Sequence, residues 1–170
     1  SARTRALLLF AMAAPIAAAA CGDDESQAPL YPAIVFEMRA TIEPGAERHV
    51  CQFVKLPDDA DELFVKGGVY DTSDGTHHFL LFRTAPDMPE QPLDEPIDCY
   101  EGEGVMQYER GFVTGGQLAH DAQEFPFGLA LAFQRGDVLL MQTHVVNASA
   151  EPKEATVRVE LTREDPAAVT

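Results

Sequence analysis

The sequence predicts an all-β protein, an antiparallel β-sandwich with a jelly-roll-like arrangement that folds as a single domain. Three observations predict this fold. Apolar residues come in short runs separated by turn-forming residues, the last run alternates between apolar and polar positions, and no stretch after the first twenty residues has a long helical period. This patterning is typical of two packed antiparallel sheets.

The first segment has the features of an export signal. Arg3 and Arg5 precede an apolar stretch, and a run of alanines leads directly into Cys21. This pattern predicts a signal peptide over residues 1–20, because the apolar stretch is shorter than the roughly 20 residues of a membrane span. Cys21 and its surroundings resemble a bacterial lipobox, which predicts a lipid on Cys21 and a flexible tether over residues 21–32. The alternative is a plain secreted protein with an unpaired cysteine.

The expected location is therefore the bacterial cell envelope, facing the periplasm or the exterior, with membrane contact through the lipid anchor only. The chain is strongly acidic, with 28 acidic and 12 basic residues and a formal charge of −16. Removal of the leader, which holds two of the basic residues, leaves a charge of about −18. We expect no nucleic-acid partner, because binding a polyanion requires clustered Lys and Arg.

The predicted domain covers residues 33–165. Its expected strands are short apolar runs at residues 33–42, 49–56, 62–70, 77–83, 137–147 and 155–162. Turn-forming pairs such as Pro44-Gly45, Asp74-Gly75 and Gly136-Asp137 separate them. In the last run Val157, Val159 and Leu161 share one face. About 150 residues without an internal repeat correspond to one domain.

With Cys21 assigned to lipid, the remaining two cysteines form a candidate disulfide. Disulfides persist in exported proteins, and a bridge from Cys51 to Cys99 would close a loop of about 50 residues. It would join the strand before residues 77–83 to the long loop after them and hold that region rigid.

The histidines are the candidate functional residues. His77 and His78 are neighbours at the start of a strand, where side chains alternate between faces, so both reach one metal only if the backbone is irregular. Asp74-Gly75, immediately before them, supplies such an irregularity. His144 shares a strand face with Gln142, which indicates that this face is not simply core. Spacing alone leaves open that these are ordinary surface or hydrogen-bonded imidazoles.

The sequence around these histidines resembles the copper type II, ascorbate-dependent monooxygenases, the family of peptidylglycine α-hydroxylating monooxygenase and dopamine β-monooxygenase. "THHFLLFR" (residues 76–83) is similar to the family's His-His strand, and residues 111–149 are similar to its segment in which a Gly-rich turn and a proline precede Gln-x-His. Cys51 and Cys99 fall where one of the family's disulfides lies. The adjacent histidines match the N-terminal copper domain of that family rather than the C-terminal one.

The resemblance implies one copper per chain, held by His77, His78 and His144. In the family, this copper stores and delivers an electron, while oxygen chemistry occurs at a methionine-containing copper in the other domain. The expected function is thus copper redox or oxygenase chemistry that needs a second copper domain or a separate redox partner. Whether the chain is itself an enzyme stays open.

Two other readings remain. One is a non-enzymatic periplasmic or surface protein that binds and buffers copper, and the other is a structural or ligand-binding β-sandwich. Zinc could also occupy three imidazoles. His120, in a segment expected to be a loop near the third-ligand strand, is a candidate additional ligand. His49 is expected to be a partly exposed strand residue outside the site.

Overall fold

The computed structural model of the protein describes residues 31–99 and 104–170. The predicted leader and Cys21 lie outside the described residues, as does most of the predicted tether. Among the described residues, no helix is long and apolar enough to span a membrane.

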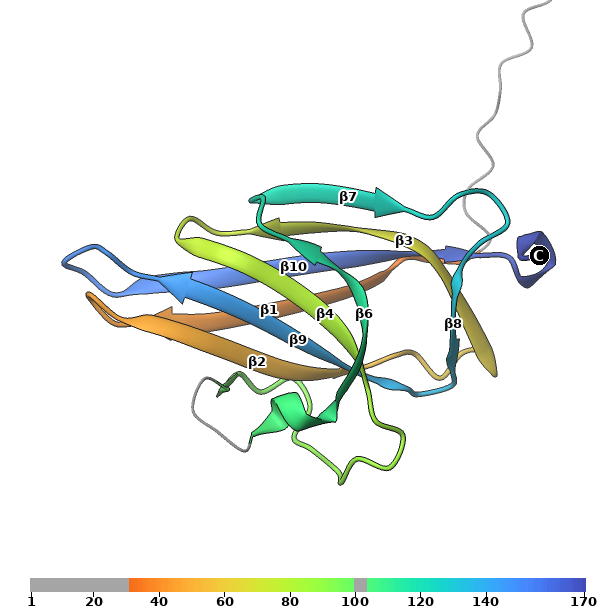
Figure 1. Cartoon of the computed structure of the whole chain (residues 1–170), viewed down its shortest axis with the longest axis horizontal. Coiled ribbons are helices and arrows are strands. Elements are labelled where there is room, and N and C mark those ends of the chain that lie inside the picture. The colour runs from red at the N-terminus through yellow and green to blue at the C-terminus, as the bar shows by residue number, and fades with distance from the viewer. Residues whose placement is uncertain (1–30, 100–103) are drawn as a thin grey trace, which may run out of the picture.

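The described chain forms two antiparallel sheets, which confirms the predicted all-β sandwich (Figure 1). The strands are β1 (Ile34–Ile42), β2 (Glu47–Lys55), β3 (Glu62–Thr72), β4 (Thr76–Thr84), β5 (Ile97–Asp98), β6 (Glu109–Gly116), β7 (His120–Glu124), β8 (Leu131–Gln134), β9 (Val138–Val146) and β10 (Lys153–Glu164). Two short 3-10 helices, η1 (Val105–Tyr108) and η2 (Pro166–Ala168), complete the described structure.

The strand order is that of a jelly roll with additions. The first sheet has the order β1-β10-β3-β7, with β8 also paired to β3, and the second has the order β5-β2-β9-β4-β6. The strands β1 to β4 therefore alternate between the sheets, as do β9 and β10. The six expected strands are all present, whereas β5, β6, β7 and β8 were not predicted.

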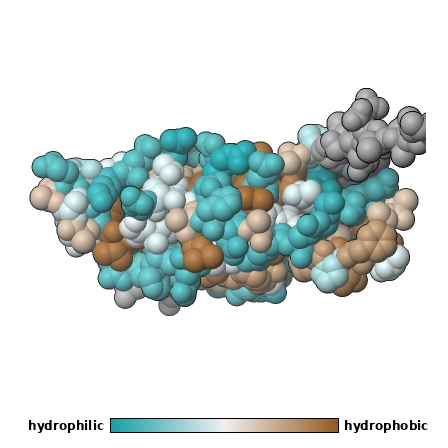
Figure 2. All heavy atoms as spheres, turned by 90° about the horizontal axis from the view of Figure 1, so that it is seen from above, coloured by the Kyte–Doolittle hydropathy of each residue, from teal (hydrophilic) through white to brown (hydrophobic). Residues whose placement is uncertain are grey.

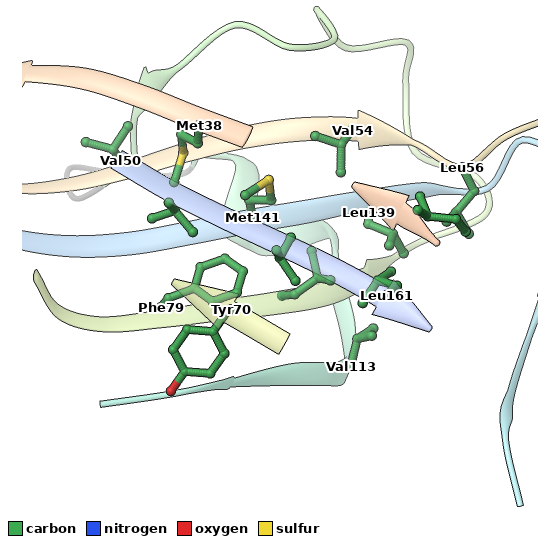
Figure 3. Packing of buried hydrophobic residues seen from close by; sticks show 14 of the residues in the cluster. Met38, Val50, Val54, Leu56, Tyr70, Phe79, Val113, Leu139, Met141 and Leu161 are labelled. Carbon is green, nitrogen blue, oxygen red and sulfur yellow. The ribbon is translucent and has the colours of Figure 1, made fainter. Parts of the chain in front are cut away.

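The main core lies between the sheets and is built from alternating strand positions. In β10, Val157, Val159 and Leu161 are each at most 2% exposed, as the alternation predicts. They pack with residues of the second sheet such as Phe79 and Met141 (Figure 3). Burying these apolar faces against each other is the main force that holds the two sheets together.

A second, smaller core lies on the outer face of the second sheet. Described residues of the segment between β4 and β6, such as Met88 and Met106, pack against Cys51, Phe53 and Leu140, and Cys99 of the same segment is part of this cluster. As a result the middle of β2 is buried on both faces, with an unbroken buried run from Val50 to Val54. The remainder of the molecular surface is mostly hydrophilic in the view of Figure 2, in keeping with the acidic composition.

The two ends of the sandwich differ. The turns β1–β2, β3–β4 and β9–β10 gather at one end, whereas β1 begins at the other, near the end of β10 (Figure 1). Asn147 ties two of the turns together, since its carbonyl accepts from the Gly45 N–H at 2.8 Å and its side-chain amide donates to the Ile42 carbonyl at 2.9 Å. The end with the three turns carries the histidines.

Candidate metal centre

Three adjacent strands of the second sheet place histidines in register on its outer face. His144 of β9 pairs with His49 of β2 on one side and with His78 of β4 on the other. Directly paired residues have their Cβ atoms about 5 Å apart on the same face of a sheet. The outer face therefore carries a row of imidazoles at the end where the turns gather.

A β-bulge brings His77 to the same group. The pairing of β4 with β9 shifts between Thr76 and His78, so His77 is the extra residue of the bulge. Gly75, in the turn before it, has a φ of +91°, a conformation that favours glycine. The hydroxyl of Thr143 donates to the His78 carbonyl at 3.0 Å and helps to fix the irregular backbone. The predicted irregularity at the strand start is thus present.

His77, His78 and His144 form a compact triangle. Their ring centroids lie 5.1 to 5.6 Å apart, and their candidate ligand nitrogens all lie within 4.8 Å of one another. The Nδ1 atoms of His77 and His78 are 3.3 Å apart. Nitrogens bound to one ion at about 2.0 Å can be at most about 4 Å apart. Small ring rotations therefore suffice to close the triangle around a metal ion.

The triangle is open to solvent on one side. The His77 side chain is exposed, while those of His78 and His144 are half-buried. A metal ion could therefore reach the triangle without any unfolding. The strands β9 and β4, which carry His144 and His78, lie inside the second sheet and hold these two side chains in place.

The surroundings favour neutral imidazoles. Burial lowers the pKa of His78, and the neighbouring histidines, His144 foremost, lower it further against a hydrogen bond to Gln142 that raises it. Burial also lowers the pKa of His49, with His144 acting in the same direction and Glu47 opposing. A neutral ring has the lone pair that a metal requires, so the lowered pKa of His78 favours coordination by this ring near neutral pH.

Glu47 contacts the third histidine of the triangle. Its Oε1 lies 2.7 Å from Nε2 of His144, whose side chain is only 14% exposed. Nδ1 is then the His144 nitrogen that remains for another partner. No feature of the sequence had singled out Glu47.

Gln142 links the histidines to the covered part of the same face. It is buried and hydrogen-bonded to His78, and its Nε2 lies 3.6 Å from Sδ of Met106, in η1. The expectation that the Gln142 and His144 face is not simply core is confirmed. Met141 is fully buried in the main core on the opposite face, so its sulfur points away from the histidines.

The predicted disulfide joins Cys51 to Cys99, with Cα atoms 5.8 Å apart. Cys51 lies opposite Gln142 in the β2–β9 pairing, two positions from His49. The bridge therefore fastens the covering segment to the sheet beside the histidines, as expected.

Two expectations about single histidines need correction. His120 lies not in a loop beside β9 but at the start of β7, at the edge of the first sheet, where its Nδ1 is 2.7 Å from Oδ1 of Asp71. It is not part of the three-histidine group. His49 is partly exposed, as predicted, but it does not lie outside the site, because its ring stacks on His144 with centroids 4.3 Å apart. Only the register of β2 on β9 reveals this contact.

In comparisons with known proteins, no family model and no curated protein matches the chain. The structure thus establishes an all-β sandwich with one disulfide and a three-histidine group close enough to hold a metal ion.

Proposed function

We propose that this chain is an exported copper-binding protein with one mononuclear site formed by His77, His78 and His144. The observation that carries the proposal is the convergence of these three side chains, two of them from a bulged strand start and one from the neighbouring strand. Such a convergence needs a backbone irregularity that an ordinary surface histidine pair would not require.

The donor set fits copper. All three ligands are imidazoles, which suit copper, zinc, iron and nickel, and copper(II) binds a given nitrogen site more tightly than the other divalent ions of its row. Three neutral imidazoles also accept copper(I) without a fourth protein ligand. Copper in such a site supplies one-electron redox chemistry, and the resemblance of the surrounding motifs to copper type II monooxygenases favours copper over zinc.

An electron-carrying or metal-carrying role is supported better than self-contained catalysis. A hollow of about 400 Å³ is lined by residues such as Arg83, Phe133 and Leu139. It lies where β4 ends and β9 begins, while His78 and His144 lie at the opposite ends of those strands. By its resemblance to the electron-delivering domain of the copper type II monooxygenases, we propose that the site exchanges electrons with a separate redox or monooxygenase partner. The second candidate is copper buffering or hand-over without redox turnover, favoured by the open face at His77.

The metal content of protein isolated without chelator tests the site. We expect about one copper per chain, and competition should show that zinc binds more weakly. Protein that carries no metal and takes up none on titration would refute the proposal. Oxygen consumption then separates the two roles. It is measured with ascorbate as the electron donor and with a cell fraction that contains the redox or monooxygenase partner. A protein that only buffers copper should not increase the oxygen consumption of that fraction.

Export and anchoring form a separate part of the proposal, supported by the sequence around Cys21. We propose lipid attachment there and a location in the bacterial cell envelope. Replacing Cys21→Ser should move the protein from the membrane fraction to the soluble fraction. Wild-type protein that is fully soluble after processing would contradict it.

A further inference from the structure

We infer that Glu47 is a positioning residue of the metal centre, which holds the His144 ring through its Nε2 so that Nδ1 faces His77 and His78. This inference rests on the copper site proposed above, and part of its test is independent of any metal. Glu47 is not a ligand in this arrangement but acts through His144.

The contact itself determines which nitrogen is available. An ionised carboxylate only accepts hydrogen bonds, and a neutral imidazole carries one N–H. At 2.7 Å from Glu47 Oε1, Nε2 of His144 must therefore be the nitrogen that donates. Nδ1 of His144 is left with its lone pair, which is the state required of a metal ligand.

The His144 ring is held at its face as well as at its edge. His49 stacks on it with an interplanar angle of 17°, from the strand that also carries Glu47. Glu47 and His49 are two positions apart on β2, so they point to the same side of the sheet. Because the two rings are nearly parallel, the nitrogens of His49 do not converge with those of His144 on one point. The strand β2 thus orients a ligand without supplying one.

The other two histidines lie next to the His144 ring, with centroids 5.1 and 5.3 Å away. The Nδ1 atoms of His77 and His78 already lie 3.3 Å apart, and Nδ1 of His144 would complete a set of three like nitrogens. A carboxylate that binds the far nitrogen of a ligating histidine fixes the tautomer and raises the basicity of the ligand. Copper(II), with the higher charge, should gain more from this carboxylate than copper(I).

The metal-independent test is nitrogen NMR of the His144 ring in the metal-free protein at about pH 8, above the ordinary histidine pKa. We expect an Nε2–H signal protected by its hydrogen bond in the wild type, and its loss by exchange in Glu47→Ala. A proton on Nδ1 in the wild type, or an equally protected signal in Glu47→Ala, would overturn the inference. Either result is readable even if the protein proves to bind no copper.

The metal test compares Glu47→Ala and Glu47→Gln with the control Glu43→Gln, which removes the same charge in the turn before β2. Glu47→Ala should weaken copper(II) binding about tenfold, the low end for such partners because the Glu47 side chain is 62% exposed. Copper(I) binding should weaken about threefold less than copper(II) binding, which raises the reduction potential by roughly 30 mV. Glu47→Gln should lie between Glu47→Ala and the wild type, since its amide oxygen can still accept from Nε2.

The control Glu43→Gln should leave both affinities and the potential unchanged. Equal losses of copper affinity in Glu43→Gln and Glu47→Gln would show that the effect comes from the overall charge of the protein, and this result would overturn the inference. Equal losses of copper(II) and copper(I) affinity in Glu47→Ala would remove the preference expected of a carboxylate behind His144 and overturn the inference as well. If His144→Ala itself has no effect on binding, the proposed copper site fails, and the NMR result alone decides the role of Glu47.

Discussion

The outer face of the second sheet has two halves built on the same strands, β2, β9 and β4, and they serve different purposes. One half is sealed by the segment between β4 and β6, with Cys51, Phe53 and Leu140 all at most 1% exposed. The other half carries four histidines and stays partly open to solvent. The same pairing pattern thus yields a buried cluster where a loop covers it and a partly exposed group of histidines where no described loop does.

The two halves of this face are connected through one buried side chain. Gln142 stands at the boundary, bonded to His78 on one side and to Met106 on the other. If the division holds, substitutions in the covered half should change stability more than metal binding, and substitutions in the open half should do the reverse.

The largest effect is expected from removal of the disulfide. Cys51→Ala combined with Cys99→Ala releases a constraint over a separation of 48 residues, which should lower the free energy of unfolding by about 4 kcal/mol. Denaturant titration measures it. The copper affinity of the protein that is still folded should change less than threefold. Loss of copper binding without loss of stability would contradict the division of this face into a structural half and a metal-binding half.

The next effect concerns the central ligand. His144→Ala should weaken copper binding at least about tenfold, or roughly 1.4 kcal/mol, with little loss of stability. His77→Ala and His78→Ala should behave similarly. His120→Ala is the matched control on the other sheet and should bind copper as the wild type does. Equal copper affinity in the wild type and in His144→Ala would refute the proposed copper site.

Acid should act on the open half, through its histidines. The folded state lowers the pKa of His78 and His49 below the ordinary value of 6.5, so the unfolded chain binds protons more readily. Stability is therefore full above about pH 6.5 and declines as the pH falls through the lowered values. Denaturant midpoints against pH measure this decline, which His78→Gln should reduce. Stability that rises on acidification over the same range would contradict the assignment.

The smallest effect is expected from His49→Ala. Because its ring stacks on His144 and does not converge on the triangle, copper affinity should fall no more than about threefold, less than 1 kcal/mol. His49→Phe, which keeps an aromatic ring against His144, should be closer still to the wild type. A loss comparable to that of His144→Ala would show that His49 is a ligand.

Strands were predictable where one face of the strand is strictly apolar, as in β10, and where turn-forming residues mark both ends of the strand. The strands β6 and β7 were missed because their residues are largely exposed or glycine-rich, and their strand character comes from pairing with β4 and β3. The bulge before His78 was predictable because Asp74-Gly75 marks it locally. The contacts of His49 and Glu47 were not, since they depend on the register of two strands about 90 residues apart in the chain.

The long axis of the sandwich has a consequence for access. Tyr31, near the start of β1, packs against Arg163 at the end opposite the histidines, and a strand of nine residues spans about 30 Å. The described chain therefore begins at the end of the sandwich away from His77, His78 and His144, so a lipid on Cys21, as proposed above, would join the molecule at the end opposite the histidines.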